Sequence, residues 1–562
     1  ALDWLVIGVF FLALIGIIVW VVRQKQNDSA DYFLGGRDAT WLAIGASIFA
    51  SNIGSEHLIG LAGAGASSGM AMAHWEIQGW MILILGWVFV PFYTRSMVYT
   101  MPEFLERRYN PQSRTILSVI SLVSYVLTKV AVTVYAGGLV FQQVFGIKEL
   151  WGIDFFWIAA IGLVVLTALY TIFGGMKSVL YTSVLQTPIL LLGSLIILVL
   201  GFKELGGWDE MMRVCGAVTV NDYGDTMTNL IRSNDDANFP WLGALIGSAI
   251  IGFWYWCTDQ FIVQRVLSGK NEMEARRGTI FGAYLKLLPV FLFLIPGMIA
   301  FALHQKYIGA GGEGFLPMLA NGTANADAAF PTLVAKLLPA GVKGLVVCGI
   351  LAALMSSLAS LFNSSAMLFT IDFYKRFRPE TPEKKLVGIG QVATVVIVIL
   401  GILWIPIMRS VGDVLYTYLQ DVQSVLAPGI AAAFLLGICW KRTSAQGGMW
   451  GLIAGMVIGL TRLGAKVYYS NAGEVADSTF KYLFYDMNWL FFCGWMFLFC
   501  IIVVIVVSLA TKAPTAEKIQ GLVFGTATKE QKAATRASWN HWDIIHTVII
   551  LAITGAFYWY FW

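Results

Sequence analysis

Long apolar runs, repeated along the whole chain, constrain this sequence more than any other feature. A helix needs about 20 apolar residues to cross roughly 30 Å of hydrocarbon. Of the 562 residues, 58% are hydrophobic and 12% are charged, whereas a soluble domain has roughly a quarter charged residues. We therefore predict an all-α polytopic membrane protein whose surroundings are the lipid bilayer.

The apolar runs predict about fourteen transmembrane helices. They are expected near 4–22, 40–62, 73–94, 114–145, 153–173, 178–201, 240–263, 278–303, 343–373, 386–407, 412–439, 446–466, 484–510 and 541–562. The first run has no basic residue before it and no small-residue cleavage site after it, which is typical of a spanning helix rather than a signal peptide.

Basic residues predict the orientation of the chain. With both termini outside, most Lys and Arg residues fall in the inner connections, as the positive-inside rule expects. We predict a multi-pass protein of the plasma (inner) membrane with both termini outside.

The outer connection 304–342 should contain a short interfacial helix from Phe330 to Leu338. The inner connection 511–540 should form a surface helix or a tether, and a plain linker is the favoured alternative.

One apolar segment, Gly45 to Gly60, carries an amide, a carboxylate and an imidazole: Asn52, Glu56 and His57. Such groups are costly at membrane depth and normally face a cavity. The Gly and Ser residues beside them would let the helix break, which leaves backbone carbonyls for an ion or a solute. A packing kink with satisfied polar groups is the alternative. Because Glu56 and His57 are adjacent, a regular helix would point them to different faces.

A second interrupted segment, Ile246 to Gln260, contains four consecutive aromatic residues from Phe253 to Trp256, followed by Asp259 and Gln260. An aromatic wall with nearby polar groups suits a sugar, which has an apolar face and many hydroxyls. An interfacial aromatic belt is the alternative. The two segments lie five spans apart, which favours an inverted-repeat transporter with its site at the midplane.

Serines recur every four residues at Ser356, Ser360 and Ser364, so they share one helical face. Their hydroxyls could simply bond back to carbonyls one turn earlier. The other interpretation is a site for a hard cation, in which the adjacent hydroxyls of Ser356 and Ser357 add to carbonyls of a broken partner helix.

Two charged residues lie inside apolar segments, Lys286 and Glu76. Snorkelling to the interface is the alternative explanation for Lys286. Each charge would be much less costly if both faced a shared cavity. The amide of Gln420 is a further candidate for that cavity.

Five separated motifs resemble the sodium/solute symporter family, in particular its sodium–glucose cotransporter branch. The motifs are Asn52 to His57, Tyr255 to Gln260 with Gln264-Arg265, Gly282 to Lys286, Ser356 to Ser360 and Gly174 to Thr182. The resemblance covers nearly the whole chain and includes the number of helices.

This resemblance implies a leucine-transporter-type 5+5 inverted-repeat core that works by alternating access, with helices two and seven broken. The core would occupy residues 40–440, after an extra helix and inner loop in 1–39 and before extra helices in 441–562. Na⁺ would be held by carbonyls of Ala50, Ile53 and Ala353 and hydroxyls of Ser356 and Ser357. The implied solute ligands are Asn52, His57, Glu76, Trp256, Lys286 and Gln420. Tyr255 would close the inner side of the site, and Leu61, Trp75 and Tyr416 the outer side.

Four positions bear on specificity and stoichiometry within this resemblance. His57 is similar to the mammalian glucose carriers, whereas Gly79 and Gly252 stand where some relatives have polar sugar contacts. Ser183 stands where many relatives have an Asp near the inner ion path, which weakens the case for a second Na⁺. Lys129 resembles the mammalian pattern, and the sequence does not name its partner.

The function implied is Na⁺-coupled symport of a monosaccharide of the glucose or galactose type. Na⁺-coupled symport of myo-inositol or another small polar solute is the alternative. We expect Na⁺ and a small solute as partners and no nucleic acid. We do not expect an enzyme, because the five histidines have no metal-ligand spacing and no nucleophile–base pair is evident. A membrane sensor would need a signalling domain, which these residues do not supply.

Overall fold

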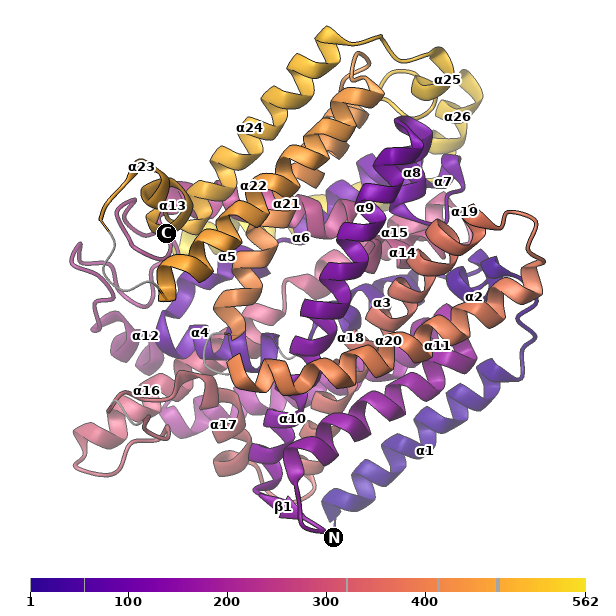
Figure 1. The fold of residues 1–562 in the computed structure, drawn as a ribbon. Coiled ribbons are helices and arrows are strands. Elements are labelled where there is room, and N and C mark those ends of the chain that lie inside the picture. The colour runs from indigo at the N-terminus through magenta and orange to yellow at the C-terminus, as the bar shows by residue number, and fades with distance from the viewer. Residues whose placement is uncertain (1, 55, 320–321, 412–414, 472–475) are drawn as a thin grey trace.

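The computed structural model describes residues 2–54, 56–319, 322–411, 415–471 and 476–562, which are mostly helical (Figure 1). Side chains are not described at several further helical positions, including 404–411 and 415–422. The strands β1 (Glu149–Leu150) and β2 (Ile153–Asp154) form a small antiparallel ribbon. The chain is thus an all-helical membrane protein in its described parts, apart from this ribbon and isolated bridges.

The N-terminal half runs from α1 to α13. Its helices are α1 (Leu2–Val22), α2 (Ser29–Leu34), α3 (Trp41–Asn52), η2 (Glu56–Leu61), α4 (Ala62–Ser67), α5 (Ala73–Glu76), α6 (Gly79–Ile84), α7 (Val90–Ser96), α8 (Met101–Arg108), α9 (Pro111–Ser124), η5 (Tyr125–Val130), α10 (Ala131–Phe145), α11 (Phe155–Leu205), α12 (Trp208–Gly216) and α13 (Trp241–Gly252). The short helical turns η1 (Gly35–Arg37), η3 (Gly69–Met72) and η4 (Leu85–Phe89) connect some of them.

The C-terminal half runs from η6 to α27. Its helices are η6 (Phe253–Thr258), α14 (Gln260–Leu267), α15 (Glu272–Lys286), η7 (Val290–Leu294), α16 (Ile295–Gly309), η8 (Ala326–Ala328), α17 (Ala329–Leu337), α18 (Val342–Met367), η9 (Leu368–Tyr374), α19 (Lys375–Phe377), α20 (Glu383–Val411), α21 (Leu415–Cys439), α22 (Ala445–Asn471), α23 (Thr479–Lys481), η11 (Tyr482–Asp486), α24 (Trp489–Ala510), α25 (Ala516–Ile519), α26 (Lys529–Ala537) and α27 (His541–Tyr560).

Ten helical stretches in the described part are long and apolar enough to cross a membrane. They are Leu2–Val22, Gly69–Ser96, Phe155–Leu205, Trp241–Thr258, Glu272–Gly309, Val342–Phe377, Glu383–Leu403, Ala445–Lys466, Trp489–Ala510 and His541–Tyr560. Two expected helices, 153–173 and 178–201, lie together in α11, where Gly175 has non-helical angles (φ 55°, ψ −147°). The expected helix 412–439 begins at residues outside the described part and continues as α21.

Two of the long connections, 304–342 and 511–540, also contain helix. The helix expected from Phe330 to Leu338 is present as α17 (Ala329–Leu337), and its interfacial position stays a prediction. The segment 511–540 contains two short helices, α25 and α26, rather than one. At one edge of the molecule α21, α22 and α24 pack side by side, and α1 packs against α11 on another side (Figure 1).

The interrupted segment Gly45–Gly60 has a non-helical residue at its centre. Helix α3 ends at Asn52, Ile53 is extended (φ −76°, ψ 110°), and helical structure is present again from Glu56. The amide of Gly54 donates to His57 Nδ1 (3.4 Å), and the amide of His57 donates to the Gly54 carbonyl (3.1 Å). In a continuous helix these two amides would donate to the carbonyls of Ala50 and Ile53. Because of the break, the carbonyls of Ala50 and Ile53 do not accept the hydrogen bonds that a continuous helix would give them from these two amides.

The segment Ile246–Gln260 changes conformation at Asp259, which is extended (φ −79°, ψ 129°) between η6 and α14. Its carboxylate accepts a hydrogen bond from the amide of Phe261, so Asp259 is the N-cap of α14. The sequence Thr258-Asp259 thus ends one helix and starts the next without leaving the first amides of α14 unsatisfied.

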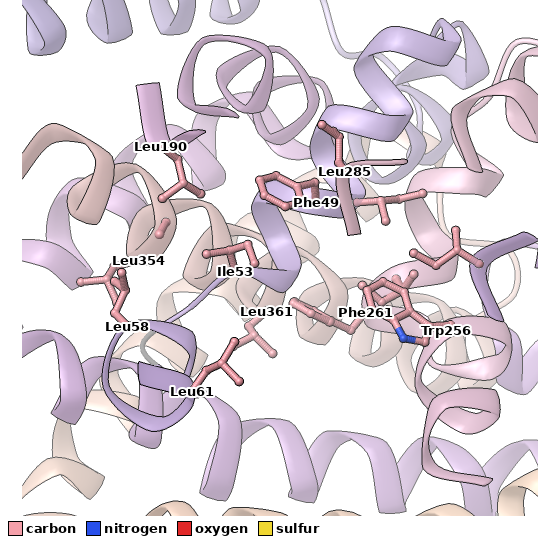
Figure 2. Close-up of a cluster of buried hydrophobic side chains, with 14 of the residues drawn as sticks. Phe49, Ile53, Leu58, Leu61, Leu190, Trp256, Phe261, Leu285, Leu354 and Leu361 are labelled. Atoms are coloured by element: carbon pink, nitrogen blue, oxygen red, sulfur yellow. The ribbon is translucent and has the colours of Figure 1, made fainter. Parts of the chain in front are cut away.

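Small residues let α3 and α15 approach closely enough to place the site. A Cβ on Gly278 would lie 2.6 Å from Ile44 Cβ, and one on Gly45 would lie 2.9 Å from the Gly278 carbonyl oxygen. Larger residues there would force the two helices apart. Around the break after Asn52, apolar side chains from α3, η2, α11, α14 and α18 fill the interior (Figure 2).

Candidate functional site

A cavity of about 80 Å³ lies where the two interrupted segments meet. Its described lining combines charged, amide and aromatic side chains with a few apolar ones. The lining residues are Asn52, Glu56, His57, Leu61, Trp75, Glu76, Gln78, Ile251, Gly252, Tyr255, Trp256, Lys286 and Gln423. A cavity with convergent polar groups inside a membrane protein is the arrangement expected of a solute site.

The buried ion pair between Lys286 and Glu76 is the central polar feature of the cavity. Lys286 Nζ lies 2.6 Å from Glu76 Oε2 and 3.1 Å from Asn52 Oδ1, to which it also donates. Both side chains are at most 10% exposed. Removing one partner of such a pair leaves an uncompensated buried charge, at a cost of about 3–5 kcal/mol. The pair explains how α15 can carry a lysine this deep in an apolar segment.

His57 and Glu56 both line the cavity, although a regular helix would point them to different faces. Both residues lie in η2, directly after the break, where the helical periodicity is that of a wide turn rather than a regular α-helix. His57 Nε2 is 3.2 Å from Glu76 Oε1. His57 thus contacts the same carboxylate that pairs with Lys286.

Aromatic rings form a large part of the cavity wall. The Tyr255 hydroxyl accepts a hydrogen bond from Asn52 Nδ2 (3.2 Å), and the Trp256 ring centroid lies 5.3 Å from Lys286 Nζ. Trp75 stacks on Trp489 with ring centroids 5.5 Å apart. Its indole N–H is buried and has no hydrogen-bond acceptor among the described residues. The wall thus combines apolar ring faces with a buried indole N–H that lacks a described acceptor.

The structure brings most of the predicted solute and gate residues to this one cavity. Eight of them line it: Asn52, His57, Leu61, Trp75, Glu76, Tyr255, Trp256 and Lys286. The side chains of Tyr416 and Gln420 lie outside the described part. The roles assigned to all ten residues stay predictions.

Two amides in the cavity wall were missed at the level of sequence. Gln423 is three residues after Gln420 on α21, a spacing that puts the two on one helical face. Gln78 follows Glu76 by two residues, and its Nε2 donates to the Ser248 carbonyl (2.8 Å). A Cβ on Gly252 would lie 2.6 Å from Gln78 Oε1. The glycine therefore leaves room for the Gln78 amide, and this steric relation has no signal in the sequence.

The residues predicted to hold Na⁺ come from the break after α3 and from α18. Ala50, Ile53, Ala353, Ser356 and Ser357 are all buried. A Cβ on Gly54 would lie 3.3 Å from Ser357 Oγ, so the break passes close to that hydroxyl. The carbonyls of Ala50 and Ile53 have lost their helical amide partners, as described above. This set offers neutral oxygen atoms only, which are ligands that a hard monovalent cation accepts.

Further serines surround this oxygen-rich region and connect three helices. Ser183 Oγ of α11 lies 3.3 Å from Ser356 Oγ, and Ser360 donates to the Ser356 carbonyl (2.8 Å). Ser51 and Ser360 share a hydrogen bond of 2.5 Å, and Arg265 Nε donates to Ser51 Oγ (3.1 Å). Ser183 thus belongs to a network of neutral serine hydroxyls. The buried guanidinium of Arg265 joins this network at Ser51.

Comparison with known proteins identifies close similarity over most of the chain. The sequence profile of the Sodium:solute symporter family matches residues 32–455. The human sodium/myo-inositol cotransporter 2 is 36% identical over 538 residues, which cover 93% of this chain and 79% of that protein. The zebrafish (Danio rerio) sodium/glucose cotransporter 4 is also 36% identical, over 92% of this chain and 80% of that protein.

A solved structure shows the same fold. A Na⁺-coupled sialic acid symporter in a substrate-bound outward-open state superimposes with a TM-score of 0.72, covering 92% of this chain and 99% of that one. The two sequences are 21% identical, so the likeness concerns the fold alone.

Proposed function

The chain belongs to the Sodium:solute symporter family, and we propose that its solute is a monosaccharide of the glucose or galactose type, carried with Na⁺ by alternating access. That it is a multi-pass membrane protein and a Na⁺-coupled solute symporter follows from the family and from relatives that are cotransporters. Transport, rather than a chemical conversion, is therefore its activity. The identity of the solute and the roles of individual residues are what we propose.

The observation that carries the proposal is the Glu76–Lys286–Asn52 cluster in the wall of an aromatic cavity. A sugar hydroxyl can both donate and accept, so it can bridge a carboxylate, an ammonium and an amide at once. Asn52, His57, Glu76, Lys286 and Gln420 would bind hydroxyls, and Trp256 and Tyr255 would pack on the apolar face of the ring. The unpaired indole N–H of Trp75 adds a further donor.

A cyclic polyol such as myo-inositol, or another small polar solute, is the second candidate. Two observations favour myo-inositol. Several relatives with 36–37% identity are sodium/myo-inositol cotransporters, and the described lining of the cavity has polar side chains from several elements that suit the hydroxyls of any cyclic polyol. Competition between labelled glucose and unlabelled myo-inositol separates these two solutes.

Na⁺ is the coupling ion, and we propose that it binds at the break after Asn52. Carbonyls of Ala50, Ile53 and Ala353 and hydroxyls of Ser356 and Ser357 would hold it. The diverted amides of Gly54 and His57 support the first two ligands, because they leave those carbonyls without their helical partners. One positive charge that moves down a membrane potential contributes about 2.3 kcal/mol per 100 mV, which is available to drive solute uphill.

The proposed architecture is a 5+5 inverted repeat of leucine-transporter type in residues 40–440, with broken helices two and seven. An extra helix would precede it in 1–39 and further helices follow in 441–562, to give fourteen spans with both termini outside. Leu61, Trp75 and Tyr416 would close the outer side of the site and Tyr255 the inner side. The breaks at Ile53 and Asp259 support this arrangement, since each gives a helix two halves that can move separately.

The test is uptake of labelled glucose, galactose or myo-inositol into proteoliposomes that contain the purified chain, with an inward Na⁺ gradient. We expect uptake that collapses when choline replaces Na⁺ and that saturates with solute. Lys306→Ala is the matched control for lysine variants, because Lys306 is exposed and donates only to the Leu205 carbonyl among the bonds described for it. Equal uptake in choline and in Na⁺ would contradict Na⁺ coupling. If no hexose competes for uptake, the proposal that the solute is a monosaccharide is wrong.

A further inference from the structure

Lys129 is a second buried lysine, outside the proposed solute and Na⁺ sites. It lies in η5 (Tyr125–Val130), between α9 and α10, with its side chain 10% exposed. Its Nζ is 2.8 Å from Asp259 Oδ2. A charged side chain at membrane depth is tolerated when it is paired. The structure therefore supplies the partner that the sequence left unnamed.

Four aromatic rings surround the same ammonium. The distances from Lys129 Nζ to the ring centroids are 4.9 Å for Tyr125, 5.3 Å for Trp254, 4.9 Å for Tyr255 and 4.9 Å for Phe261. A cation this close to a ring is attracted by the negative potential of the ring face, most strongly where water is excluded. Lys129 thus holds rings from both sides of the break at Asp259.

The break itself is held from the same direction. Asp259, the partner of Lys129, caps α14 through its contact with the amide of Phe261 (3.4 Å). The hydroxyl of Tyr125, one turn before Lys129 in η5, accepts a hydrogen bond from that same amide (3.2 Å). Tyr125 and Lys129 of η5 therefore hold the start of α14, through the amide of Phe261 and the carboxylate of Asp259.

Tyr255 connects this cluster to the cavity. Its hydroxyl accepts from Asn52 Nδ2, and the residue lines the cavity. Lys129 is not among the described residues of the lining. Among the rings that surround the Lys129 ammonium, Tyr255 is the one that lines the cavity, so it is the direct contact between the two.

We propose that Lys129 is a positioning residue that keeps Tyr255 across the inner side of the cavity, because its ammonium holds the Tyr255 ring and the Asp259 cap together. The inference rests on the proposed function in one respect, namely that Tyr255 closes the inner side of the site. Without the ammonium the ring and the break are free to move apart. The cavity then opens to the inner side more often when neither Na⁺ nor solute is bound.

The test reads access to the cavity and needs no solute. Ile251→Cys places a thiol in the cavity wall, and a cationic methanethiosulfonate is added from each side of the membrane in turn, without Na⁺. The same proteins without Ile251→Cys give the background from the six native cysteines. We expect Lys129→Met to raise the labelling rate about tenfold from the inner side only. Lys129→Arg should keep the wild-type rate, because a guanidinium also pairs with a carboxylate and binds ring faces.

A second variant separates positioning from a general loss of stability. Lys129→Met with Asp259→Asn removes both charges, so the melting temperature should return toward that of wild type, and the asparagine still caps α14. The proposal expects labelling to stay high in this double variant. It is overturned if labelling returns with the melting temperature, if Lys129→Met leaves labelling unchanged, or if labelling rises equally from both sides. Failure of the proposed function would appear separately, as absence of Na⁺-driven uptake by the wild-type chain.

Discussion

Two buried lysine–carboxylate pairs lie near each other in this molecule and have different surroundings. Lys286 and Glu76 line the cavity, together with the amide of Asn52, so their remaining hydrogen-bonding capacity is directed at the place where a solute would bind. Lys129 and Asp259 are enclosed by aromatic rings and by the start of α14. The proposals above therefore assign a binding role to the pair that lines the cavity and a positioning role to the pair that is enclosed.

Replacing each lysine with methionine should give the largest difference in solute affinity between the two pairs. Lys286→Met removes a donor and leaves the Glu76 carboxylate without its lysine, with His57 as its remaining described partner. We expect solute affinity to fall about a hundredfold, since hydrogen bonds to charged groups contribute about 1.5–3 kcal/mol each. Lys129→Met should change the solute KM only a few-fold, through Tyr255. The measurement is the KM for Na⁺-driven uptake, with Lys306→Ala as the control. Equal loss in both variants would mean that the two pairs have one role.

The carboxylates should differ in the same way but less. Glu76→Gln keeps the size and one acceptor, and we expect about a tenfold rise in solute KM because the charge-assisted bonds become neutral ones. Asp259→Asn still caps α14, so its main effect should be a lower melting temperature with nearly unchanged KM. Solute titrations and thermal unfolding of the two purified variants check this. A larger change in KM for Asp259→Asn than for Glu76→Gln would reverse the assignment.

Neutralising a whole pair sharpens the contrast. Lys286→Met with Glu76→Gln should recover the melting temperature relative to either single change, because no unpaired charge is left, yet its solute binding should stay low. Lys129→Met with Asp259→Asn should recover the melting temperature and a KM within a few-fold of wild type. Thermal unfolding and uptake on the same preparations decide between them, and recovered uptake in the first double variant would count against Lys286 as a solute ligand.

The smallest expected effect concerns the neutral oxygen site, which contains neither pair. Ser357→Ala removes one hydroxyl ligand, and we expect the Na⁺ concentration for half-maximal uptake to rise about fivefold, which corresponds to roughly 1 kcal/mol. At saturating Na⁺ the solute KM should be unchanged. Uptake measured against Na⁺ concentration tests this, with Ser118→Ala as a control, since its hydroxyl bonds only to the Arg114 carbonyl among the contacts described. An unchanged Na⁺ dependence would place the ion elsewhere.

Much of the helical framework could be predicted from the sequence, because membrane depth demands about 20 apolar residues per span whatever the fold. The helix α17 is an example of a prediction that is confirmed within two residues. The boundary expected between 153–173 and 178–201 coincides with the non-helical residue Gly175 inside α11, close to the charged Lys177. Glu56 and His57 reach the same cavity because the chain directly after the break is not a regular α-helix, which the sequence did not indicate.

The sequence by itself determined that polar and charged residues lie within apolar segments at Asn52, Glu76 and Lys286, and that their solvation requires partners or a cavity. Only the tertiary structure decided which partners they have. It paired Lys286 with Glu76 and Lys129 with Asp259, and it placed Gln78 in the space left by Gly252. The cost of burying a polar group depends on its residue type, so it can be inferred from the local sequence. Pairing depends on distances between segments far apart in the chain, and these distances are set only when the helices pack together.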